Sequence, residues 1–310
     1  HADAALITNI AADHIGDFGV QNIEELADVK WVVTRALGDS GVLVLNADDP
    51  LLVARAKTSP ARLIWFSPDP RNPVLRAHAA TGGTICTLNR GRIVLARGTE
   101  LQPVVAIKQI PICFGGAARH NVANALGATA LASALCISPE SIANGLRALR
   151  IEDNPGRANF YSIKGAQVLL DFAHNPHGLR AMIDMAASLP AQRRLLIIGQ
   201  AGDRSDEDIR DLARAAEALS FERILIKELP TKNRGRPAGE VAALLKDEFM
   251  QQGYRARQIA TVKNELAALR AALRWTRSGD LVVFLAHEDR TKAEAMLKRL
   301  DESSNVEGAK

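Results

Sequence analysis

Polar side chains crowd together directly after an apolar stretch near the middle of the chain. Residues 167–172 are almost wholly apolar and predict a buried strand that carries Asp171 near its end. His174 and Asn175 follow at once, and the next residue is a proline that ends the strand before a helical pattern. Open α/β sheets bind ligands at the carboxyl ends of such strands, and a carboxylate there suits a ribose diol. Asp171 is therefore a candidate nucleotide ligand.

Three further predicted strands end in polar clusters: Gly202-Asp203-Arg204, the loop that carries Arg234 and Arg236, and His287-Glu288-Asp289. Each cluster alone could be an ordinary solvated loop with a helix cap. Carboxyl ends of parallel strands meet at one edge of a sheet, so we expect these clusters to lie near one another. The arginines in this group suit an anionic group of a substrate. Together the clusters favour a ligand site over separate solvated loops.

Weaker candidates lie in the first half of the chain. Asn9 and His14 follow the first predicted strand, where small and polar groups could meet a phosphate or a metal, although a histidine in such a place is more often structural. Lys30 lies among apolar neighbours in a helical pattern. Its position alone favours a structural interpretation, in which the aliphatic part of the side chain lies along these neighbours and the ammonium group reaches solvent. Asn121 and Asn124 are one helical turn apart and could either bond an adenine edge or cap the helix.

The elements that position the first-half residues alternate between strand and helix. Strands are predicted at 5–10, 42–46 and 62–66, with helices at 21–37 and just after Asp49-Pro50. This order implies a parallel sheet. From Val74 to Ile107 the pattern changes to alternating strands, and the turn at 89–92 predicts a hairpin, so we expect a small antiparallel sheet there. Helices are predicted at 121–135 and 139–149, the second capped by Ser138.

The second half begins after a turn at Asn154-Pro155-Gly156 and alternates regularly. Its predicted strands are 167–172, 194–199, 223–227, 257–262 and 280–285. Its predicted helices are 178–188, 206–219, 239–251, 264–276 and 290–300. We expect a Rossmann-like, doubly wound α/β domain. The predicted domain boundaries are 1–155 and 156–302, with a polar tail at 303–310 that should fray.

Composition excludes several classes of protein. Aromatic residues make up only 4% of the 310 residues, which argues against a stacking surface for nucleic acids. The net charge of +4 allows a nucleotide ligand but does not demand a polyanion. Cys86, Cys113 and Cys136 are far apart, which predicts a reduced cytoplasmic compartment and no thiolate metal site. No apolar run is long enough to predict a membrane span, and the first residues do not show the basic segment and apolar core expected of a signal peptide.

Taken in order, the motifs resemble those of the Mur ligases, a family of ATP-dependent amide-forming ligases. They are Asn9-Ile10 with Asp13-His14, Lys30, Asn46-Ala47-Asp48-Asp49, His120-Asn121 with Asn124, Pro155-Gly156-Arg157, Asp171 with Ala173-His174-Asn175-Pro176, and Gly202-Asp203-Arg204. The resemblance covers nearly the whole chain. The residue sequences of three motifs resemble those in the carboxyl-terminal half of cyanophycin synthetases. That half adds arginine to the side-chain carboxylate of an aspartate polymer.

The resemblance implies roles for these residues. His14 would approach Mg²⁺ and the phosphates, and Lys30 would bind metal as a carbamate. Arg157 would contact the γ-phosphate, so that His14, Lys30 and Arg157 form the catalytic set. Asn9 belongs with the nucleotide-binding residues.

The remaining implied contacts concern adenosine and the incoming amine. Asn121 and Asn124 would meet adenine, and Asp171 would hold the ribose with His174 and Asn175 beside it. The amine substrate would be held by the loops that contain Gly202, Asp203, Arg204, Arg234 and Arg236. ATP would phosphorylate a carboxylate, and the amine would attack the acyl phosphate. The implied cofactors are ATP and Mg²⁺, and the implied partners are an amino acid and a peptide or polymer.

One departure from the family concerns the phosphate loop. Mur ligases bind ATP phosphates with Gly-x-x-Gly-Lys-[Ser/Thr], and this sequence contains no Gly-Lys dipeptide and no upstream Mg²⁺-binding glutamate. We therefore expect the chain to need an upstream part of the same polypeptide and to be inactive alone. Alternatives are a non-catalytic nucleotide- or polymer-binding remnant, and a peptidoglycan or folylpolyglutamate type of ligase. A homo-oligomer is left open.

Overall fold

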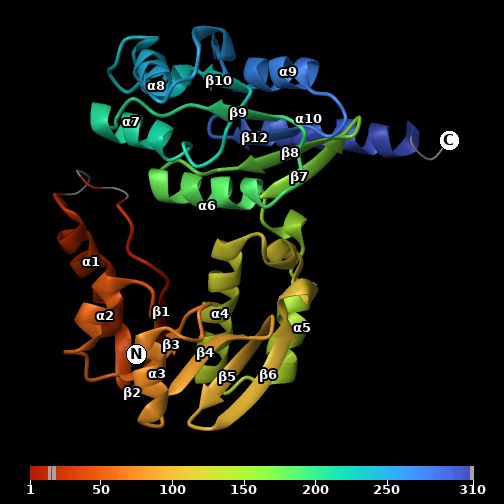
Figure 1. The fold of residues 1–310 in the computed structure, drawn as a ribbon. Helices are drawn as coiled ribbons and strands as arrows, with labels where there is room; N and C mark the ends of the chain where they lie inside the picture. Colours follow the sequence, from red (N-terminus) through yellow and green to blue (C-terminus); the bar gives the residue numbers. More distant parts are fainter. Residues whose placement is uncertain (13–14, 16–18, 308–310) are drawn as a thin grey trace. The chain divides into compact units, whose positions relative to one another are not determined.

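Two six-stranded sheets organise the chain (Figure 1). The computed structural model describes residues 1–12, 15 and 19–307. The chain divides into two compact units, His1–Arg150 and Ile151–Lys310, each built on one of the sheets. The candidate residues are therefore distributed over two separate scaffolds.

The sheet of unit 1 has the strand order β1-β2-β3-β4-β5-β6. The strands are β1 (Ala2–Ile7), β2 (Leu37–Asn46), β3 (Arg62–Phe66), β4 (Thr84–Asn89), β5 (Arg92–Arg97) and β6 (Glu100–Ala106). Strands β1 to β4 are parallel, and β4, β5 and β6 are antiparallel neighbours. The predicted parallel start and hairpin are confirmed. The antiparallel strands continue the parallel sheet through β4 and do not form a separate small sheet.

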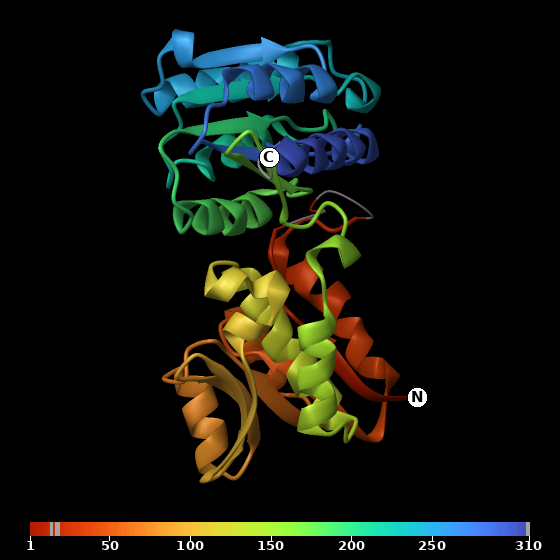
Figure 2. The same cartoon turned by 90° about the vertical axis from the view of Figure 1, so that its right-hand side faces the viewer.

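Helices cover both faces of this sheet. They are α1 (Ile23–Trp31), η1 (Val32–Ala36), α2 (Pro50–Ala56), α3 (Pro73–Ala80), η2 (Ile107–Gln109), η3 (Pro111–Gly116), α4 (Arg119–Ala134) and α5 (Pro139–Ala148). Alternate residues of β2 point to opposite faces, so Val42 and Val44 pack with α4 and α5 while Leu43 and Leu45 pack with α1, α2 and α3. Figure 2 shows α4 and α5 side by side on one face.

Three predicted elements of unit 1 are wrong in extent or type. The stretch that starts at Val74 is helical and not a strand, because Pro73 occupies the first turn of α3 and the Asn72 side chain accepts from Val74 N at 2.9 Å. The first strand lies earlier than predicted. The predicted helix 21–37 stops at Trp31, after which η1 leads into β2.

The sheet of unit 2 has the order β11-β10-β9-β12-β8-β7. The strands are β7 (Asn159–Ile163), β8 (Ala166–Asp171), β9 (Arg194–Ile198), β10 (Arg223–Lys227), β11 (Ile259–Val262) and β12 (Leu281–Leu285). All are parallel except β7, which lies antiparallel at the edge beside β8. The main helices are α6 (Pro176–Ala187), α7 (Asp206–Arg214), α8 (Glu240–Gln251), α9 (Glu265–Trp275) and α10 (Arg290–Glu307), with short turns η4 (Ile151–Asp153), η5 (Pro230–Lys232) and η6 (Ala256–Gln258).

The doubly wound architecture predicted for this half is confirmed. Apolar side chains of α9 and α10 pack with one set of alternate strand residues, among them Val168 and Phe284. Helices α6, α7 and α8 bury their apolar side chains outside that cluster, and α7 contacts both of the other two.

Two features of unit 2 differ from the prediction. Strand β7 precedes the stretch predicted to hold the first strand, and it turns into β8 through Lys164 and Gly165, which have φ of 50° and 77°. Helix α10 continues to Glu307, past the predicted end at residue 300, so residues 303–307 of the predicted frayed tail are helical. The Asp301 carboxylate accepts from Ser162 N at 3.1 Å, which ties α10 to β7. Within the described part of the chain, no helix is both long and apolar enough to cross a bilayer.

Candidate functional site

The carboxyl ends of β8, β9, β10 and β12 form one edge of the unit 2 sheet, because these strands are parallel. The loops after β9 and β10 meet there. Gly202 N donates to Lys232 O at 2.9 Å, and Asp203 forms an ion pair with Arg234. A Cβ on Gly202 would lie 2.0 Å from Asn233 O, so only glycine allows this approach. The predicted meeting of these two loops is confirmed.

Arg236 braces this pair of loops. Its Nε donates to Gly202 O at 2.9 Å, and a terminal nitrogen donates to Arg204 O at 2.6 Å. The other terminal nitrogen pairs with Asp206 at 2.7 Å and with Glu240. Arg234 and Arg236 thus both have partners within the chain. Their predicted contact with a substrate stays a prediction.

Charged and aromatic side chains surround the ring of Phe172, which directly follows β8. The guanidinium of Arg157 lies 5.5 Å from the ring centroid, and that of Arg290 lies 5.8 Å away. The rings of His174 and His287 lie at 5.3 and 5.6 Å. Arg157 is therefore held at the ligand edge by a cation–π contact. Our sequence reasoning missed Phe172, because an aromatic residue that ends an apolar run is ordinarily part of a core.

The polar residues next to Phe172 shape the loop after β8. Asp171 is only 6% exposed, and its two carboxylate oxygens accept from Ala173 N at 2.7 Å and Ala158 N at 2.8 Å. Burial raises the pKa of Asp171, although these hydrogen bonds and the charge of Arg157 oppose the rise. Asn175 caps α6 by accepting from Gly178 N at 2.7 Å. Each residue thus has a structural role beside its predicted contact with the nucleotide.

A buried ion pair lies beneath this edge. Lys227, at the end of β10, pairs with Glu265, the first residue of α9, and both side chains are wholly inaccessible. Lys227 Nζ also lies 3.5 Å from His287 Nδ1. Burial lowers the pKa of Lys227 to about 8, and the charge of Glu265 opposes that fall. Because the ammonium can only donate, His287 Nδ1 is the acceptor.

His287 in turn reaches the loop after β8. Its Nε2 lies 2.8 Å from Ala173 O, so Nε2 carries the proton and donates. Burial, with repulsion from Lys227, lowers the pKa of His287 well below 6.5, which keeps the ring neutral. The Glu265 carboxylate also accepts from three backbone N–H groups of the loop after β12, at 2.7 Å from His287, 3.3 Å from Glu288 and 3.0 Å from Asp289. The network joins the ends of β8, β10 and β12.

The candidate residues of unit 1 lie on different elements. Asn121, in the first turn of α4, donates from Nδ2 to Ile112 O at 2.7 Å, and Asn124 is exposed one turn later. Asn9 follows β1, where Asn46 Nδ2 donates to the neighbouring Thr8 O at 3.0 Å. Lys30 lies in the last turn of α1 and is partly exposed. His14 lies outside the described residues.

The described residues contain no cluster of metal-ligating side chains. Residues 1–12, 15 and 19–307 contain no group of three or more His, Cys, Asp or Glu side chains that could hold a metal. Of the two predicted ligands, His14 is not described, and Lys30 offers an amine unless it is carbamylated.

Comparison with known proteins identifies both units. Residues 1–132 match the family described as the Mur ligase middle domain, and residues 156–287 match the Mur ligase glutamate ligase domain. Cyanophycin synthetase from Synechocystis is 35% identical over 298 residues, which cover 96% of this chain and 34% of that protein. The UDP-N-acetylmuramoyl-tripeptide–D-alanyl-D-alanine ligase of Escherichia coli is 28% identical over 231 residues, 72% of this chain and 47% of the ligase. The chain spans about a third of the length of the cyanophycin synthetases that it matches.

Solved structures share the fold. MurF from Acinetobacter baumannii matches with a TM-score of 0.65 at 20% identity, over 97% of this chain and 60% of that one. Escherichia coli FolC in complex with ADP matches with a TM-score of 0.62 at 18% identity, over 98% and 63%. The predicted fold class is thus confirmed. With a middle domain followed by a glutamate ligase domain, the chain belongs to the Mur ligase family.

Proposed function

We propose that the chain is the middle and carboxyl-terminal part of an ATP-dependent amide ligase of the cyanophycin synthetase type. The observation that carries the proposal is the continuous similarity to cyanophycin synthetases, which covers 96% of this chain at 35% identity. In this proposal ATP phosphorylates a carboxylate. An amine then attacks the carbonyl carbon of the acyl phosphate, so that a C–N bond forms and phosphate leaves.

The nucleotide is assigned to residues of both units. Asn121 and Asn124 take adenine, Asn9 lies near the phosphates, and Asp171 takes the ribose beside His174 and Asn175. The exposed Arg157, which lies against Phe172 at the ligand edge, supports the part played by unit 2. A fixed guanidinium neutralises charge that develops on a transferring phosphoryl group.

The amine substrate is assigned to the loops after β9 and β10. Carboxylates of Asp203 and Glu288 lie at this edge, where they accept from Arg234 and Thr231. Such groups suit a cationic amino acid, and we propose arginine. The proposal further includes Mg²⁺ near His14 and a carbamylated Lys30. Because the sequence lacks a Gly-Lys dipeptide, it also assigns the phosphate loop to an upstream part of the same polypeptide, acting in the cytoplasm.

The test is ATP hydrolysis by a version of the protein that includes upstream sequence. We expect turnover that depends on Mg²⁺ and arginine. Arg157→Ala should lower kcat by about 10²- to 10³-fold, as for other groups that stabilise transition-state charge. Arg180→Ala is the matched control, because Arg180 is exposed on α6 of the same unit, and it should change kcat less than about twofold. Lack of arginine-dependent hydrolysis in every longer version would reject the proposal.

A second candidate is a nucleotide-binding module without turnover. The lack of a Gly-Lys dipeptide favours it for the isolated 310-residue chain. Calorimetry with ADP separates the outcomes. Weak ADP binding by this chain, together with no hydrolysis by any longer version, supports the module, whereas hydrolysis by a longer version supports the ligase.

A further inference from the structure

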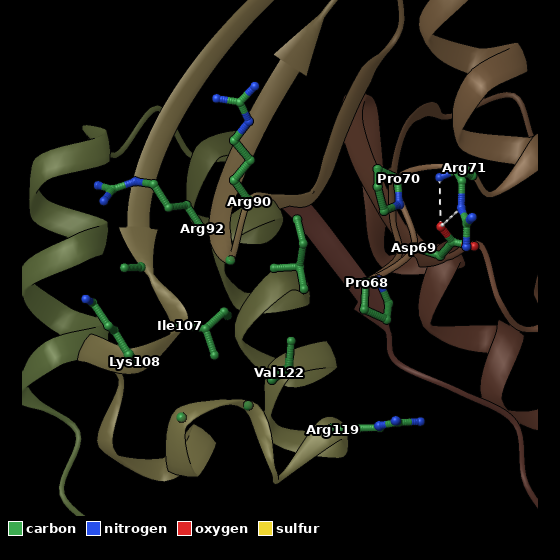
Figure 3. A pocket seen from close by; sticks show the side chains of 15 residues that line it. Pro68, Asp69, Pro70, Arg71, Arg90, Arg92, Ile107, Lys108, Arg119 and Val122 are labelled. Carbon is green, nitrogen blue, oxygen red and sulfur yellow. Dashed lines mark hydrogen bonds and ion pairs between the residues drawn. The ribbon is translucent and has the colours of Figure 1, made fainter.

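A basic cavity of about 960 Å³ lies at the carboxyl edge of β3 and β4 in unit 1 (Figure 3). Its charged lining consists of Arg71, Arg90, Arg92, Lys108, Arg119 and one acid, Asp69. These residues come from the loop after β3, the β4–β5 turn, η2 and the start of α4. In Figure 3 the side chains of Ile107 and Val122 lie between the cations. The cavity therefore combines a basic rim with an apolar interior.

Most of these cations have no partner in the described part of the chain. Among the residues that the structure describes, Arg90, Arg92, Lys108 and Arg119 form no ion pair or side-chain hydrogen bond. Arg71 alone is paired, with its Nε 3.3 Å from Asp69 Oδ1. Arginines elsewhere in the chain, such as Arg55 and Arg214, do find carboxylates. Five cations and one carboxylate leave the lining with four positive charges, as many as the net charge of the whole chain.

The backbone around the cavity adds to its attraction for anions. Helix α4 starts at the wall with Arg119, and its N-cap residue, Ala118, has no side chain that could cap the amino-terminal N–H groups. That helix end carries partial positive charge. Gly115 lies in the wall with φ of 66°, a conformation that favours glycine, and the space beside its Cα is open. Like charges gathered on a concave surface repel one another and concentrate the field on an anion that enters.

We propose that the basic cavity binds a small ligand that carries two or more separated negative groups, phosphate or carboxylate, together with an apolar part. Guanidinium groups from opposite sides would take the negative groups as paired hydrogen bonds. The apolar part would lie against Ile107 and Val122. Asn9, Asn121 and Asn124, which are assigned to the nucleotide, do not line the cavity. The site thus goes beyond the proposed ligase reaction and does not depend on it.

Calorimetry on the 310-residue chain tests the proposal with two probes, tripolyphosphate and tetra-aspartate. The double variant Arg92→Glu/Lys108→Glu reverses two unpartnered charges at the cavity. The control Arg35→Glu/Arg76→Glu makes the same change of charge at exposed positions of unit 1 that do not line it. We expect the cavity variant to weaken binding at least about 100-fold, roughly tenfold for each reversed charge, and the control less than about threefold.

The outcome with each probe decides what the site takes. Binding of tripolyphosphate alone identifies phosphate, binding of tetra-aspartate alone identifies carboxylate, and binding of both supports the shared chemistry. Hydrogen exchange should show protection of residues 88–92 and 106–109 on binding. Arg92→Lys/Lys108→Arg keeps both charges and should retain most of the affinity. The proposal is overturned if neither probe binds, or if the cavity and control variants weaken binding equally.

Discussion

Replacing Lys227 with methionine removes the cation from the buried pair with Glu265 while filling nearly the same volume. The Glu265 carboxylate would keep its three backbone donors but lose the compensating charge of Lys227. Removal of one partner from a buried ion pair costs about 3–5 kcal/mol, and the similar volume keeps any cavity contribution small. We therefore expect Lys227→Met to lower the free energy of unfolding of unit 2 by about that amount.

A double-mutant cycle separates the charge from the shape of this pair. Glu265→Gln leaves Lys227 buried without a counter-charge and should cost a similar amount. The double variant leaves no unpaired charge, so it should cost about as much as either single variant and about 3–5 kcal/mol less than their sum.

The assay is urea unfolding followed by hydrogen exchange and mass spectrometry, which reports the two units separately and makes unit 1 an internal reference. Lys263→Met is the matched control, because Lys263 is exposed beside the start of α9, and it should change stability by less than about 0.5 kcal/mol. Additive costs in the double variant, or single variants within about 1 kcal/mol of wild type, would refute the reasoning.

The remaining predictions concern pH, close packing and capping. Because burial holds the pKa of His287 well below 6.5, its contribution is complete above about pH 6.5 and declines as the pH falls, by about 1.4 kcal/mol per pH unit. Between pH 6.5 and 5.0, His287→Gln should therefore lose less unit 2 stability than wild type, by at most about 2 kcal/mol, measured by urea unfolding at each pH. Gly202→Ala should cost about 1–3 kcal/mol, since its Cβ would lie 2.0 Å from Asn233 O, whereas Gly145→Ala, with open space in α5, should raise thermal stability. Ser138→Ala removes the hydroxyl that caps α5 by accepting a hydrogen bond from Ser141 N. It should lower the free energy of unfolding of unit 1 by about 1 kcal/mol, measured in urea.

Elements with local signals could be predicted closely. Strand β3 has the predicted bounds, and α5 begins as expected because Ser138 and Pro139 form a cap within a few residues. Helix α3 and strand β7 could not be predicted in the same way. An Asn72-Pro73 start is short, and the alternating residues around it also suit a strand. Strand β7 is recognisable chiefly by its pairing with β8.

The candidate site likewise has one part that could be predicted from the sequence and one part that could not. The meeting of the loops after β9 and β10 follows from the parallel sheet, so the sequence pattern was enough to predict it. The network of Lys227, Glu265 and His287 was not predicted. Its members are 38 and 60 positions apart from Lys227, and no local pattern marks a lysine at the end of an apolar strand as the partner of a distant glutamate. Phe172 was missed because its neighbours, and not its own type, give it a role.

The brace of ion pairs at the loop edge of unit 2 has a consequence for ligand selection. Asp203 is already occupied by Arg234, and Asp206 by Arg236. A substrate guanidinium that binds Asp203 must displace the guanidinium of Arg234. Asp203 therefore has one cationic partner both before and after the substrate binds. Such an exchange yields little net attraction. Selection among cationic substrates at this edge then depends on their length and shape. Raising the ionic strength should hardly change how well a substrate competes with Arg234 for Asp203.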